Sequence, residues 1–513
     1  MKHIVFVVGN YKNGGVPMHT TNLANEFAKQ GYHSTILVTK DIAENVFFEL
    51  NKNVEIVSLK EYVCKYAEDT IAKRTVRQGK LKIRLLKYIR YISKLFPKWD
   101  KYLETEIKKI RRSEKLSVFV AKNPDSIYIP FGVSYFEDIF YAAKGKKAKI
   151  IYAERNAPEV EFPENTADRQ RIFNHLSAVS GAVLQTNDEL SFFGQSLKNA
   201  VVINNPVKAN LPERFCGNRR KVVVNFCRIA EQKNLPLMIN AFIEFYKSHP
   251  DYTLEIYGNT VENVEEELKQ EYIALIESLN ATDFIKILPP RADVHSVISD
   301  CAMFVSSSDF EGLSNSMLEA LAIGLPCVCT DCLGGGAREI ICDGENGLLV
   351  PMNDANALAQ AMNRMADDES LSEKCSENAA KINETHKVEA IAKKWLEAIE
   401  NFTSELDAAF YAEKYKADKL SGGHIILLNP KSSEYYEATK KQALKALQFY
   451  PQGMQVGGGI TAENALEYIE AGASHVIVTS YVFQDGEVNW GKLEKLYEAV
   501  GKEHIVIDLS CRK

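Results

Sequence analysis

Short apolar runs of four to six residues alternate along this chain with longer stretches in which apolar residues recur every three or four positions. The runs are typical of strands buried on both faces of a parallel sheet, and the stretches are typical of amphipathic helices. The alternation therefore predicts an α/β architecture of parallel sheets. We expect early strands at residues 4–9, 34–39, 149–153 and 182–185, and a helix at 18–30.

A second series of apolar runs follows the turn Asn204-Asn205-Pro206-Val207. It predicts strands at 221–226, 253–257, 284–288, 303–306 and 327–330. We therefore expect two domains, 1–205 and 206–387, followed by a helix within 388–404. After residue 406 the pattern changes to the strand–helix rhythm of a barrel, with strand patterns near 421–430, 455–460, 475–480 and 506–512 and helices at 434–449, 462–471 and 490–500.

Two glutamates, Glu311 and Glu319, flank a polar turn and the start of an apolar helix. A helix N-terminus offers unpaired amides and a partial positive charge, so it suits a phosphate. A carboxylate beside it would repel that phosphate but would accept hydrogen bonds from hydroxyl groups. A phosphate and a polyol bound together indicate a nucleotide sugar.

Four motifs in this order resemble the GT-B fold family 4 glycosyltransferases over residues 1–404. They are the E-x7-E segment from Glu311 to Glu319, the R-x4-K segment from Arg228 to Lys233, the glycine loop Gly14-Gly15 and the segment 334–351. The resemblance implies two Rossmann-like domains that face a cleft, with the acceptor against the first and the nucleotide-sugar donor against the second. It also implies that the helix at 388–404 crosses back to the first domain.

The resemblance also implies roles for single residues. Arg228 and Lys233 would hold the donor diphosphate, Glu319 the ribose, and Glu311 the transferred sugar, so that Glu311, Arg228 and Lys233 are the catalytic candidates. The remaining donor-binding candidates are Gly14, Gly15, Gly312, Leu313 and Ser314, the last two through their backbone amides. Each has a simpler alternative: a surface cation at a helix end, a carboxylate favoured by the helix dipole, or a plain turn.

One loop departs from many family members, which place a histidine there near the reacting sugar. It contains Glu154-Arg155-Asn156 and no histidine, and it resembles a branch of the family that acts in polysaccharide and lipid-linked glycan assembly. We expect these three residues to orient the acceptor or the transferred sugar, and we assign no catalytic base. His19 and His175 remain in the first domain, and we expect both to be packing histidines.

Residues 406–513 resemble the eukaryotic-type phosphoribosylformimino-aminoimidazole carboxamide ribotide isomerase of histidine biosynthesis, over strands two to five of its eight. The strand that carries the family's first acid is missing, and Asp508 could correspond to the second. Two loops could hold a phosphate through Gly457, Gly458, Gly459, Thr479 and Ser480. An open partial barrel leaves strand edges unpaired, so this segment would associate with a second copy, pack on the rest of the chain, or be poorly stable.

Composition agrees with a globular protein of two or three domains: 513 residues, of which 46% are hydrophobic and 25% charged. No apolar run is long enough to span a bilayer, and the first ten residues form a strand pattern rather than a signal peptide. Ten cysteines without such a signal indicate reduced thiols in the cytosol. Cys327, Cys329 and Cys332 fit a buried strand better than a zinc site.

The net charge of -6 is unevenly distributed, because residues 71–115 contain sixteen Lys or Arg and four Asp or Glu. Within them Leu81, Leu85, Ile89, Ile92 and Phe96 recur at helical spacing. We interpret this basic amphipathic helix as a contact for an anionic membrane surface; the alternative is packing on the first domain. Nothing resembling a nucleic-acid motif accompanies the charge.

Together these patterns predict a retaining glycosyltransferase of the hexosyltransferase type, located in the cytosol or on the cytoplasmic face of the membrane. It would move a sugar from a nucleoside diphosphate, UDP rather than GDP, to a glycan or lipid-linked acceptor, without a metal or other cofactor. The alternatives are a GT-B nucleotide-sugar epimerase, a sugar-binding protein, and isomerase activity through the C-terminal segment.

Overall fold

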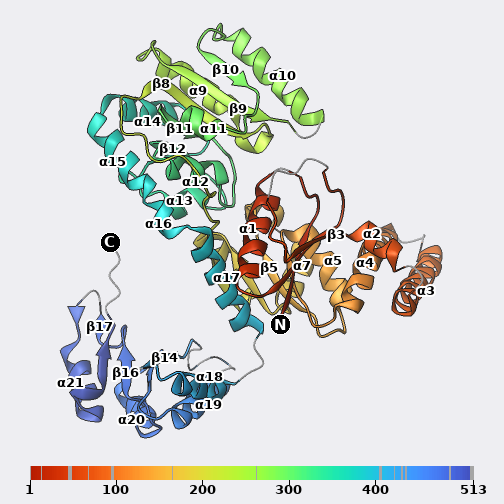
Figure 1. Cartoon of the computed structure of the whole chain (residues 1–513), viewed down its shortest axis with the longest axis vertical. Helices are drawn as coiled ribbons and strands as arrows, with labels where there is room; N and C mark the ends of the chain where they lie inside the picture. Colours follow the sequence, from red (N-terminus) through yellow and green to blue (C-terminus); the bar gives the residue numbers. More distant parts are fainter. Residues whose placement is uncertain are drawn as a thin grey trace. The chain divides into compact units, whose positions relative to one another are not determined.

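The computed structural model describes the chain except for residues 1, 13, 44–48, 67–68, 94–96, 165, 261–262, 404–406, 421, 429–430, 432, 434–435, 485–486 and 509–513. The chain divides into two units, which we call unit 1 (Met1–Thr403) and unit 2 (Ser404–Lys513). Unit 1 contains two parallel sheets and unit 2 contains a third (Figure 1). Each unit is described by itself.

The first sheet of unit 1 has seven parallel strands in the order β3-β2-β1-β4-β5-β6-β7. Their bounds are β1 (His3–Val8), β2 (His33–Val38), β3 (Val54–Ser58), β4 (Ile127–Pro130), β5 (Lys149–Ala153), β6 (Gly181–Leu184) and β7 (Ala200–Val202). The central strand β1 is buried along nearly its whole length, because helices cover both faces of the sheet. The helices of this half are α1 (Gly15–Lys29), α2 (Leu59–Lys65), α3 (Thr70–Ser93), α4 (Pro97–Lys122), α5 (Val133–Ala143), α6 (Pro158–Glu161), α7 (Ala167–Leu176) and α8 (Asn187–Phe193).

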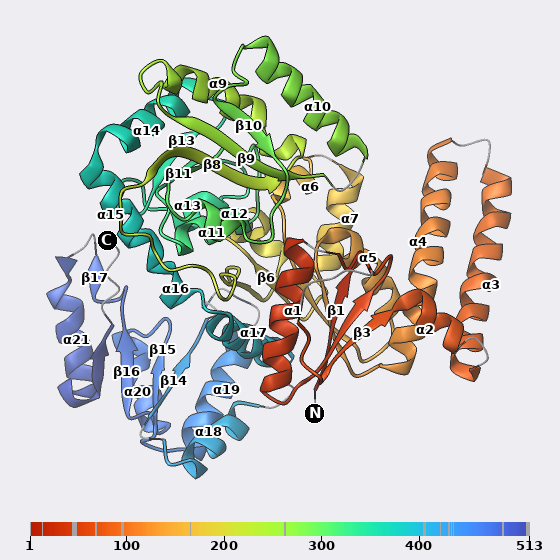
Figure 2. The same ribbon diagram turned by 45° about the horizontal axis from the view of Figure 1, so that its top comes forward.

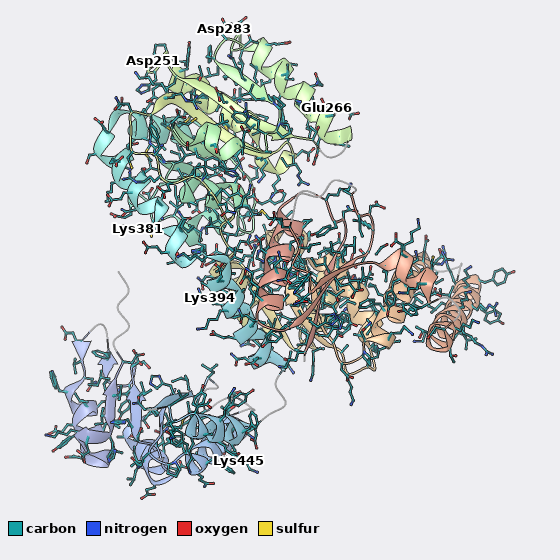
Figure 3. The ribbon with its side chains drawn as sticks, viewed as in Figure 1. Asp251, Glu266, Asp283, Lys381, Lys394 and Lys445 are labelled. Atoms are coloured by element: carbon teal, nitrogen blue, oxygen red, sulfur yellow. The ribbon has the colours of Figure 1, made fainter. Side chains whose placement is uncertain are left out.

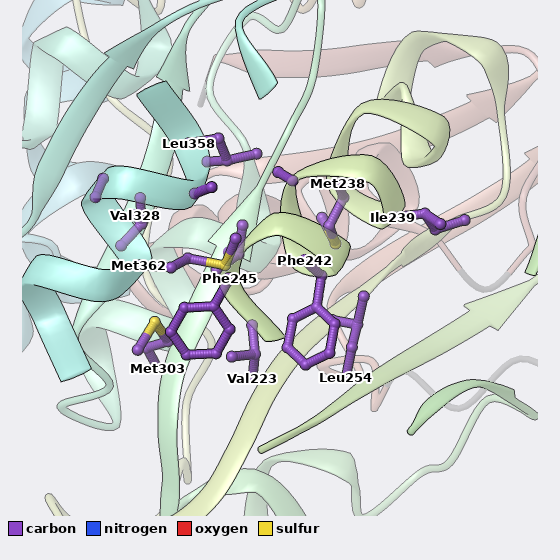
Figure 4. Packing of buried hydrophobic residues seen from close by; sticks show 14 of the residues in the cluster. Val223, Met238, Ile239, Phe242, Phe245, Leu254, Met303, Val328, Leu358 and Met362 are labelled. Carbon is purple, nitrogen blue, oxygen red and sulfur yellow. The ribbon is translucent and has the colours of Figure 1, made fainter. Parts of the chain in front are cut away.

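The second sheet of unit 1 has six parallel strands in the order β10-β9-β8-β11-β12-β13. Its strands are β8 (Arg220–Arg228), β9 (Thr253–Asn259), β10 (Ile285–Leu288), β11 (Cys301–Ser306), β12 (Cys327–Asp331) and β13 (Leu348–Pro351). Figure 4 shows its main core, where Phe242 and Phe245 of α9 (Leu235–Tyr246) pack against Val223 and Met303. The other helices are α10 (Asn263–Ser278), α11 (Val294–Ile298), α12 (Asn315–Ala322), α13 (Gly336–Ile340), α14 (Ala355–Asp367), α15 (Glu369–Ala380) and α16 (Ile382–Thr385).

The last helix of unit 1, α17 (Val388–Thr403), follows the second sheet in sequence but packs on the first. Its Trp395 is fully buried among β1 residues such as Phe6, and its Lys394 lies on the exposed side of the helix (Figure 3). An apolar face that recurs every three to four residues therefore attaches the end of unit 1 to its beginning.

Helices α3 and α4 form an antiparallel pair at the edge of the first half of unit 1, with α3 on the outer side (Figure 2). The basic stretch 71–115 therefore spans two helices, where the sequence pattern had indicated one. Arg90 of α3 bonds to Asp100 of α4 (Nε to Oδ1, 2.7 Å) and to Glu104 (Nη2 to Oε2, 3.0 Å).

Unit 2 holds a four-stranded parallel sheet in the order β14-β15-β16-β19. The strands are β14 (Gly423–Ile426), β15 (Met454–Gly457), β16 (His475–Val478) and β19 (Ile505–Ile507), and a small hairpin is formed by β17 (Phe483–Gln484) and β18 (Glu487–Val488). Its helices are α18 (Ala408–Ala417), α19 (Tyr436–Phe449), α20 (Ala462–Glu470) and α21 (Trp490–Val500). The fold class is α/β throughout, and the interpretation of unit 2 as part of a barrel stays a prediction.

Most expected elements lie within two or three residues of their predicted positions. The helix predicted at 18–30 begins earlier, at Gly15, because the loop after β1 turns directly into it. The helix predicted at 490–500 has the bounds that the pattern gave. Cys327 and Cys329 are buried on β12, and Cys332 is buried just after it.

Replacing Trp395 by alanine should lower the free energy of unfolding of unit 1 by about 3–5 kcal/mol, because it empties a large volume in the core under α17. Chemical denaturation followed by circular dichroism measures the change. Val264→Ala on α10, where the side chain is 60% exposed, is the control and should leave the transition in place. An unchanged transition in Trp395→Ala would mean that α17 is not held by this core.

Candidate active site

Two loops at the carboxyl ends of β8 and β11 are tied together by hydrogen bonds. Gln232 donates through Nε2 to the carbonyl of Phe310 at 2.8 Å and accepts at its own carbonyl from the amide of Asp309 at 3.0 Å. Ser307 donates from Oγ to the carbonyls of Lys233 (2.8 Å) and Asn234 (2.9 Å). The R-x4-K and E-x7-E segments, far apart in sequence, therefore form one rigid surface.

Lys233 and Glu311 form a close ion pair on this surface. Glu311 also accepts a hydrogen bond of 3.0 Å from Ser308 Oγ. Burial acts to lower the pKa of Lys233, but the Glu311 carboxylate more than offsets it, so the pKa lies above its ordinary value. Lys233 is therefore a charged ammonium at neutral pH, and its three N–H donors leave capacity for a further anion.

Lys233 is placed by the start of α9. Asn234 adopts the left-handed conformation (φ 43°) and caps α9, since its side chain accepts from the amide of Leu237 at 3.2 Å. This sharp turn directs the chain from the short 3-10 turn Glu231–Lys233 into the helix. Arg228, at the end of β8, is half exposed and lies 3.4 Å from Glu265 of α10 (Nε to Oε1).

The N-terminus of α12 lies beside the ion pair. Ser314 caps it by accepting from the amide of Met317 at 3.5 Å. In the described part of the chain, the amides of Ser314, Asn315 and Ser316 have no hydrogen-bond partner, which leaves them for an anion. The Leu313 amide is different: it donates to Gln185 Oε1 at 3.3 Å. The expectation that this amide is available to phosphate is therefore wrong for this conformation.

Glu319 lies one turn further along α12. Its Oε2 is 2.7 Å from His295 Nε2, and the His295 ring packs edge-on to Phe226, with ring centroids 5.4 Å apart. Phe226 lines the cavity described below, and Glu319 itself does not. Its assignment to the ribose stays a prediction, and His295 is a neighbour that the sequence did not indicate.

A cavity of about 680 Å³ lies between the two halves of unit 1. Many of the predicted residues line it: Gly14, Gly15, Arg155, Asn156, Arg228, Lys233, Glu311, Leu313 and Ser314. A larger cavity, of about 990 Å³, lies beside α1 and the linker 207–213, and none of the predicted residues lines it. We therefore place the site by its chemistry rather than by its volume.

Glycines let the loops of the two halves approach each other. A Cβ on Gly15 would lie 2.5 Å from the Asn315 side-chain nitrogen, and a Cβ on Gly312 would lie 2.3 Å from Gln185 Oε1. Gly312 does not line the cavity; it packs against Gln185 and the backbone of Arg155 in the first half. Any larger residue at Gly312 would push the E-x7-E loop away from Gln185.

The segment from Gly334 to Glu339 joins the two halves, a role that the sequence did not indicate. Thr186 Oγ1 donates to the carbonyl of Gly334 at 2.8 Å. Asn187 donates to Glu339 through both its amide (3.0 Å) and its side chain. Arg338 bridges Asp188 (Nη1 to Oδ2, 2.9 Å) and Asp331 on β12. These bonds link the two halves of unit 1.

The Glu154-Arg155-Asn156 loop faces the cavity from the first half. The guanidinium carbon of Arg155 lies over the Phe131 ring, 4.5 Å from its centroid, and 5.4 Å from the ring centroid of Trp395 of α17. Its Nη1 is 3.5 Å from Asn205 Oδ1, while its buried Nε and Nη2 find no hydrogen-bond partner among the described residues. Arg155 and Asn156 line the cavity, whereas Glu154 is fully buried behind them.

Glu154 belongs to a buried acidic cluster with Glu161 and Glu189. Burial, followed by the neighbouring Glu161, raises the pKa of Glu154; burial and Glu154 together raise the pKa of Glu189. Tyr152 donates to Glu154 Oε2 at 2.5 Å, and the amides of Arg155 and Asn156 donate to Oε1. The raised pKa values favour protonated acids, so Arg155 remains the dominant charge of this loop.

The two histidines differ. His19 lines the cavity and packs against Phe131, and neither of its ring nitrogens has a hydrogen-bond partner among the described residues. Burial, with a further contribution from Arg155, lowers its pKa well below the ordinary value, so its ring is neutral. His175 stacks on Phe140 away from the cavity, which fits the packing role expected of it.

In unit 2 the predicted phosphate residues follow adjacent strands. Gly457 ends β15, with Gly458 and Gly459 after it, and Thr479 and Ser480 follow β16. Thr479 Oγ1 is 3.4 Å from Asp508 Oδ2, so the candidate acid lies beside one of these loops. Gly458 has φ +89°, and a Cβ there would lie 2.2 Å from the Leu427 carbonyl oxygen, so this turn requires glycine.

Comparisons with known proteins agree with this geometry. The family model "Glycosyl transferases group 1" matches residues 212–382, which include β8, the ion pair and α12. These residues are a glycosyl transferase group 1 domain. A Campylobacter jejuni N-acetylgalactosaminyltransferase that acts on a diphospho-undecaprenol substrate is 28% identical over 249 residues, 46% of this chain and 65% of that protein.

Two solved structures share the fold that surrounds this glycosyl transferase domain. TarM aligns over 79% of this chain and 99% of its own, with a TM-score of 0.60 and 15% identity. Anabaena HepE in complex with UDP aligns over 78% of this chain and 100% of its own, with a TM-score of 0.59 and 18% identity. The GT-B arrangement expected of unit 1 is therefore confirmed.

A different relative matches a stretch about as long as unit 2. The histidine-biosynthesis isomerase of Medicago truncatula is 53% identical over 115 residues, which are 22% of this chain and 35% of that enzyme. The Neurospora crassa isomerase is 44% identical over 115 residues and is covered to 42%. The chain thus spans less than half the length of the isomerases it matches.

Replacing Glu154 by glutamine should flatten the pH dependence of stability. Because its folded pKa is raised, the wild-type carboxyl contributes stability at pH values below its ordinary pKa, and this contribution is lost as pH rises through the folded pKa. Each such proton makes a slope of about 1.4 kcal/mol per pH unit in that window. Thermal unfolding between pH 5 and pH 8 should therefore show a smaller decline in Glu154→Gln.

The matched control is Glu377→Gln, an exposed carboxylate on α15, which should keep the wild-type slope. Equal slopes in the wild type and in Glu154→Gln would show that Glu154 is ionised in the folded protein across this range.

Proposed function

We propose that unit 1 is a retaining glycosyltransferase that moves a sugar from a nucleoside diphosphate, UDP in preference to GDP, to a glycan or lipid-linked acceptor. The observation that carries the proposal is the convergence on one cavity of Lys233, Arg228 and the free amides of α12. A diphosphate carries the negative charge that would neutralise these cations and accept hydrogen bonds from these amides. The Glu154-Arg155-Asn156 loop faces the same cavity and would contact the acceptor or the transferred sugar.

In the proposed reaction, the bond between the anomeric carbon and the diphosphate oxygen breaks, and a bond from that carbon to the acceptor oxygen forms. The acceptor proton passes to an oxygen of the leaving diphosphate, so no side-chain base is required. Lys233, Arg228 and the α12 amides stabilise the charge that develops on the leaving group. Glu311, held by Lys233 and Ser308, would accept hydrogen bonds from the hydroxyls of the transferred sugar.

The ion pairs of the ligand-free protein fit this role. Lys233 can keep its bond to Glu311 and still donate to a phosphate, because an ammonium has three donors. Arg228 is half exposed and only loosely paired with Glu265, so it can turn toward a diphosphate. In this proposal the two cations and the helix end neutralise the donor, and no metal or other cofactor is required.

The relatives support the proposed substrates. Anabaena HepE and a mutant of TarM have been crystallised with UDP. The Campylobacter relative is named for a diphospho-undecaprenol acceptor. A nucleotide-sugar epimerase with the same cleft is the alternative enzyme; it would release UDP without any acceptor, so the dependence of UDP release on acceptor separates the two.

Lys233→Ala should weaken UDP binding at least tenfold, because in the proposed site it removes a charged contact to the donor that contributes more than about 1.4 kcal/mol. We expect the same loss for Glu319→Ala, on the proposal that Glu319 binds the ribose once the donor is present, although it does not line the cavity of the ligand-free protein. Calorimetric titration of UDP and GDP into the wild type and both variants measures this. The matched controls are Lys247→Ala and Glu244→Ala, which remove an exposed ion pair at the end of α9 and should leave binding unchanged.

If Lys233→Ala binds UDP as tightly as the wild type, the donor does not bind in this cavity. Full affinity in Glu319→Ala alone would leave the diphosphate site intact and assign Glu319 to holding His295. Absence of UDP and GDP binding in the wild type would contradict the proposed donor class altogether.

A chain that ends at Thr403 should keep the UDP affinity and turnover of the full chain, because every residue of the proposed site lies in unit 1. The two chains can be compared by the same titration and by UDP release with a candidate acceptor. A large loss in the shortened chain, if it still unfolds cooperatively, would show that unit 2 takes part in the reaction.

Isomerase activity through unit 2 is the third candidate, favoured by the 53% identity of a 115-residue stretch of this chain to a plant isomerase. The match covers 35% of that enzyme, so most of its structure has no counterpart here. We propose at most phosphate binding at the loops after β15 and β16, and association with a second copy through the open sheet edges.

A further inference from the structure

The outer face of α3 carries a row of exposed apolar side chains, which we call the outer stripe: Leu81, Leu85, Tyr88, Ile89 and Tyr91. Leu81, Tyr88 and Tyr91 are exposed to 68%, 66% and 74%. Residues spaced by three, four and seven lie on one side of a helix, so these side chains form a continuous strip. Large apolar groups collected on one helix face are unusual on a protein surface that contacts water alone.

The opposite face of α3 is the one that packs. Ile83 is buried, and Arg90, seven residues later on the same side, bonds to Asp100 and Glu104 of α4. The orientation of α3 is therefore fixed by a buried contact and an ion-pair cluster. The sequence alternative, in which Leu81, Leu85 and Ile89 pack on the first domain, is contradicted by their exposure; the side chains of Ile92 and Phe96 lie outside the described residues.

Cations border the outer stripe on both sides. Lys80, Lys82, Arg84 and Lys87 are all exposed, and they form no ion pair within the described part of the chain. Arg90 is the exception, since its charge is used internally. The stretch 71–115 has sixteen basic and four acidic residues, so the charge around the stripe is strongly positive.

We propose that the outer stripe of α3 is a docking surface for an anionic lipid bilayer, on which α3 lies in the interfacial plane. Leucine and tyrosine side chains would enter the boundary between headgroups and acyl chains while the flanking cations meet anionic headgroups. At about 1.5 Å per residue, the 24 residues of α3 make a rod of about 36 Å. Among the described residues, no helix is long and apolar enough to cross the bilayer.

Charge complementarity favours a bilayer over a second copy of this chain. A homodimer through the stripe would bring two positively charged borders together, whereas an anionic surface neutralises both. This inference is independent of the proposed function, since it involves none of the cavity residues.

The test uses the full chain and sedimentation with two kinds of vesicle, phosphatidylcholine alone and phosphatidylcholine with one third phosphatidylglycerol. One variant removes the stripe (Leu81→Ser, Leu85→Ser, Tyr88→Ser), and a second removes the border charge (Lys82→Gln, Arg84→Gln, Lys87→Gln). The matched control changes an exposed apolar residue and an exposed cation elsewhere, Val264→Ser with Lys381→Gln. All substituted side chains are exposed, so we expect each protein to melt like the wild type, which circular dichroism checks.

Wild type and control should bind the anionic vesicles at least tenfold more strongly than the neutral ones at low salt. Both α3 variants should bind the anionic vesicles at least tenfold more weakly than the wild type. High salt should also weaken the binding of the wild type to these vesicles. Equal binding to both kinds of vesicle, or unchanged binding in either variant, would overturn the proposal. A different result would also overturn it: the wild type is a dimer in sedimentation equilibrium, the stripe variant is a monomer, and the two proteins bind the vesicles equally well.

Discussion

The ion pair between Lys233 and Glu311 determines much of the architecture around the site. Both side chains are mostly buried, and a buried charge is stable only if a partner and further hydrogen bonds satisfy it. The two loops that carry them must therefore be held in register, which Ser307 and Gln232 achieve through backbone contacts. An ammonium fixed in this way is preorganised for an incoming anion, whereas a flexible surface lysine would have to be ordered on binding.

Parallel sheets explain why the sequence could predict the membership of this site. Arg228 ends β8, and Glu311 follows β11, the neighbour of β8 in the sheet. Carboxyl ends of neighbouring parallel strands meet at one edge, so residues that follow predicted strands can be expected together. The short-range pattern of apolar and turn residues was sufficient to place Arg228 and Glu311 together, because strand ends and turns depend on residues close in sequence.

The contacts that the sequence did not predict involve both halves of unit 1, or residues far apart within one half. The bond from the Leu313 amide to Gln185, the pairing of Glu319 with His295, and the bridge from Arg338 to Asp188 each join segments distant in sequence. The Leu313 and Arg338 contacts depend on how the two sheets face each other, and the Glu319 contact depends on how α12 packs beside α11 within one half; local periodicity specifies neither. The same limit applies to α3, where the pattern gave the helix but not the face that α4 covers.

The two sides of the cavity differ in their electrostatics, and the difference bears on the acceptor. On the donor side each cation already has a carboxylate partner, Glu311 for Lys233 and Glu265 for Arg228. On the other side burial raises the pKa values of Glu154 and Glu189 and lowers the pKa of Arg155, so these acids offset the charge of Arg155 less than ionised carboxylates would. The Arg155 guanidinium lies over the Phe131 ring, and two of its N–H-bearing nitrogens have no hydrogen-bond partner among the described residues, so it is suited to an anionic group. An acceptor that carries phosphate, such as a lipid-linked glycan, would supply that group, whereas a neutral glycan would leave the buried cation without a counter-charge.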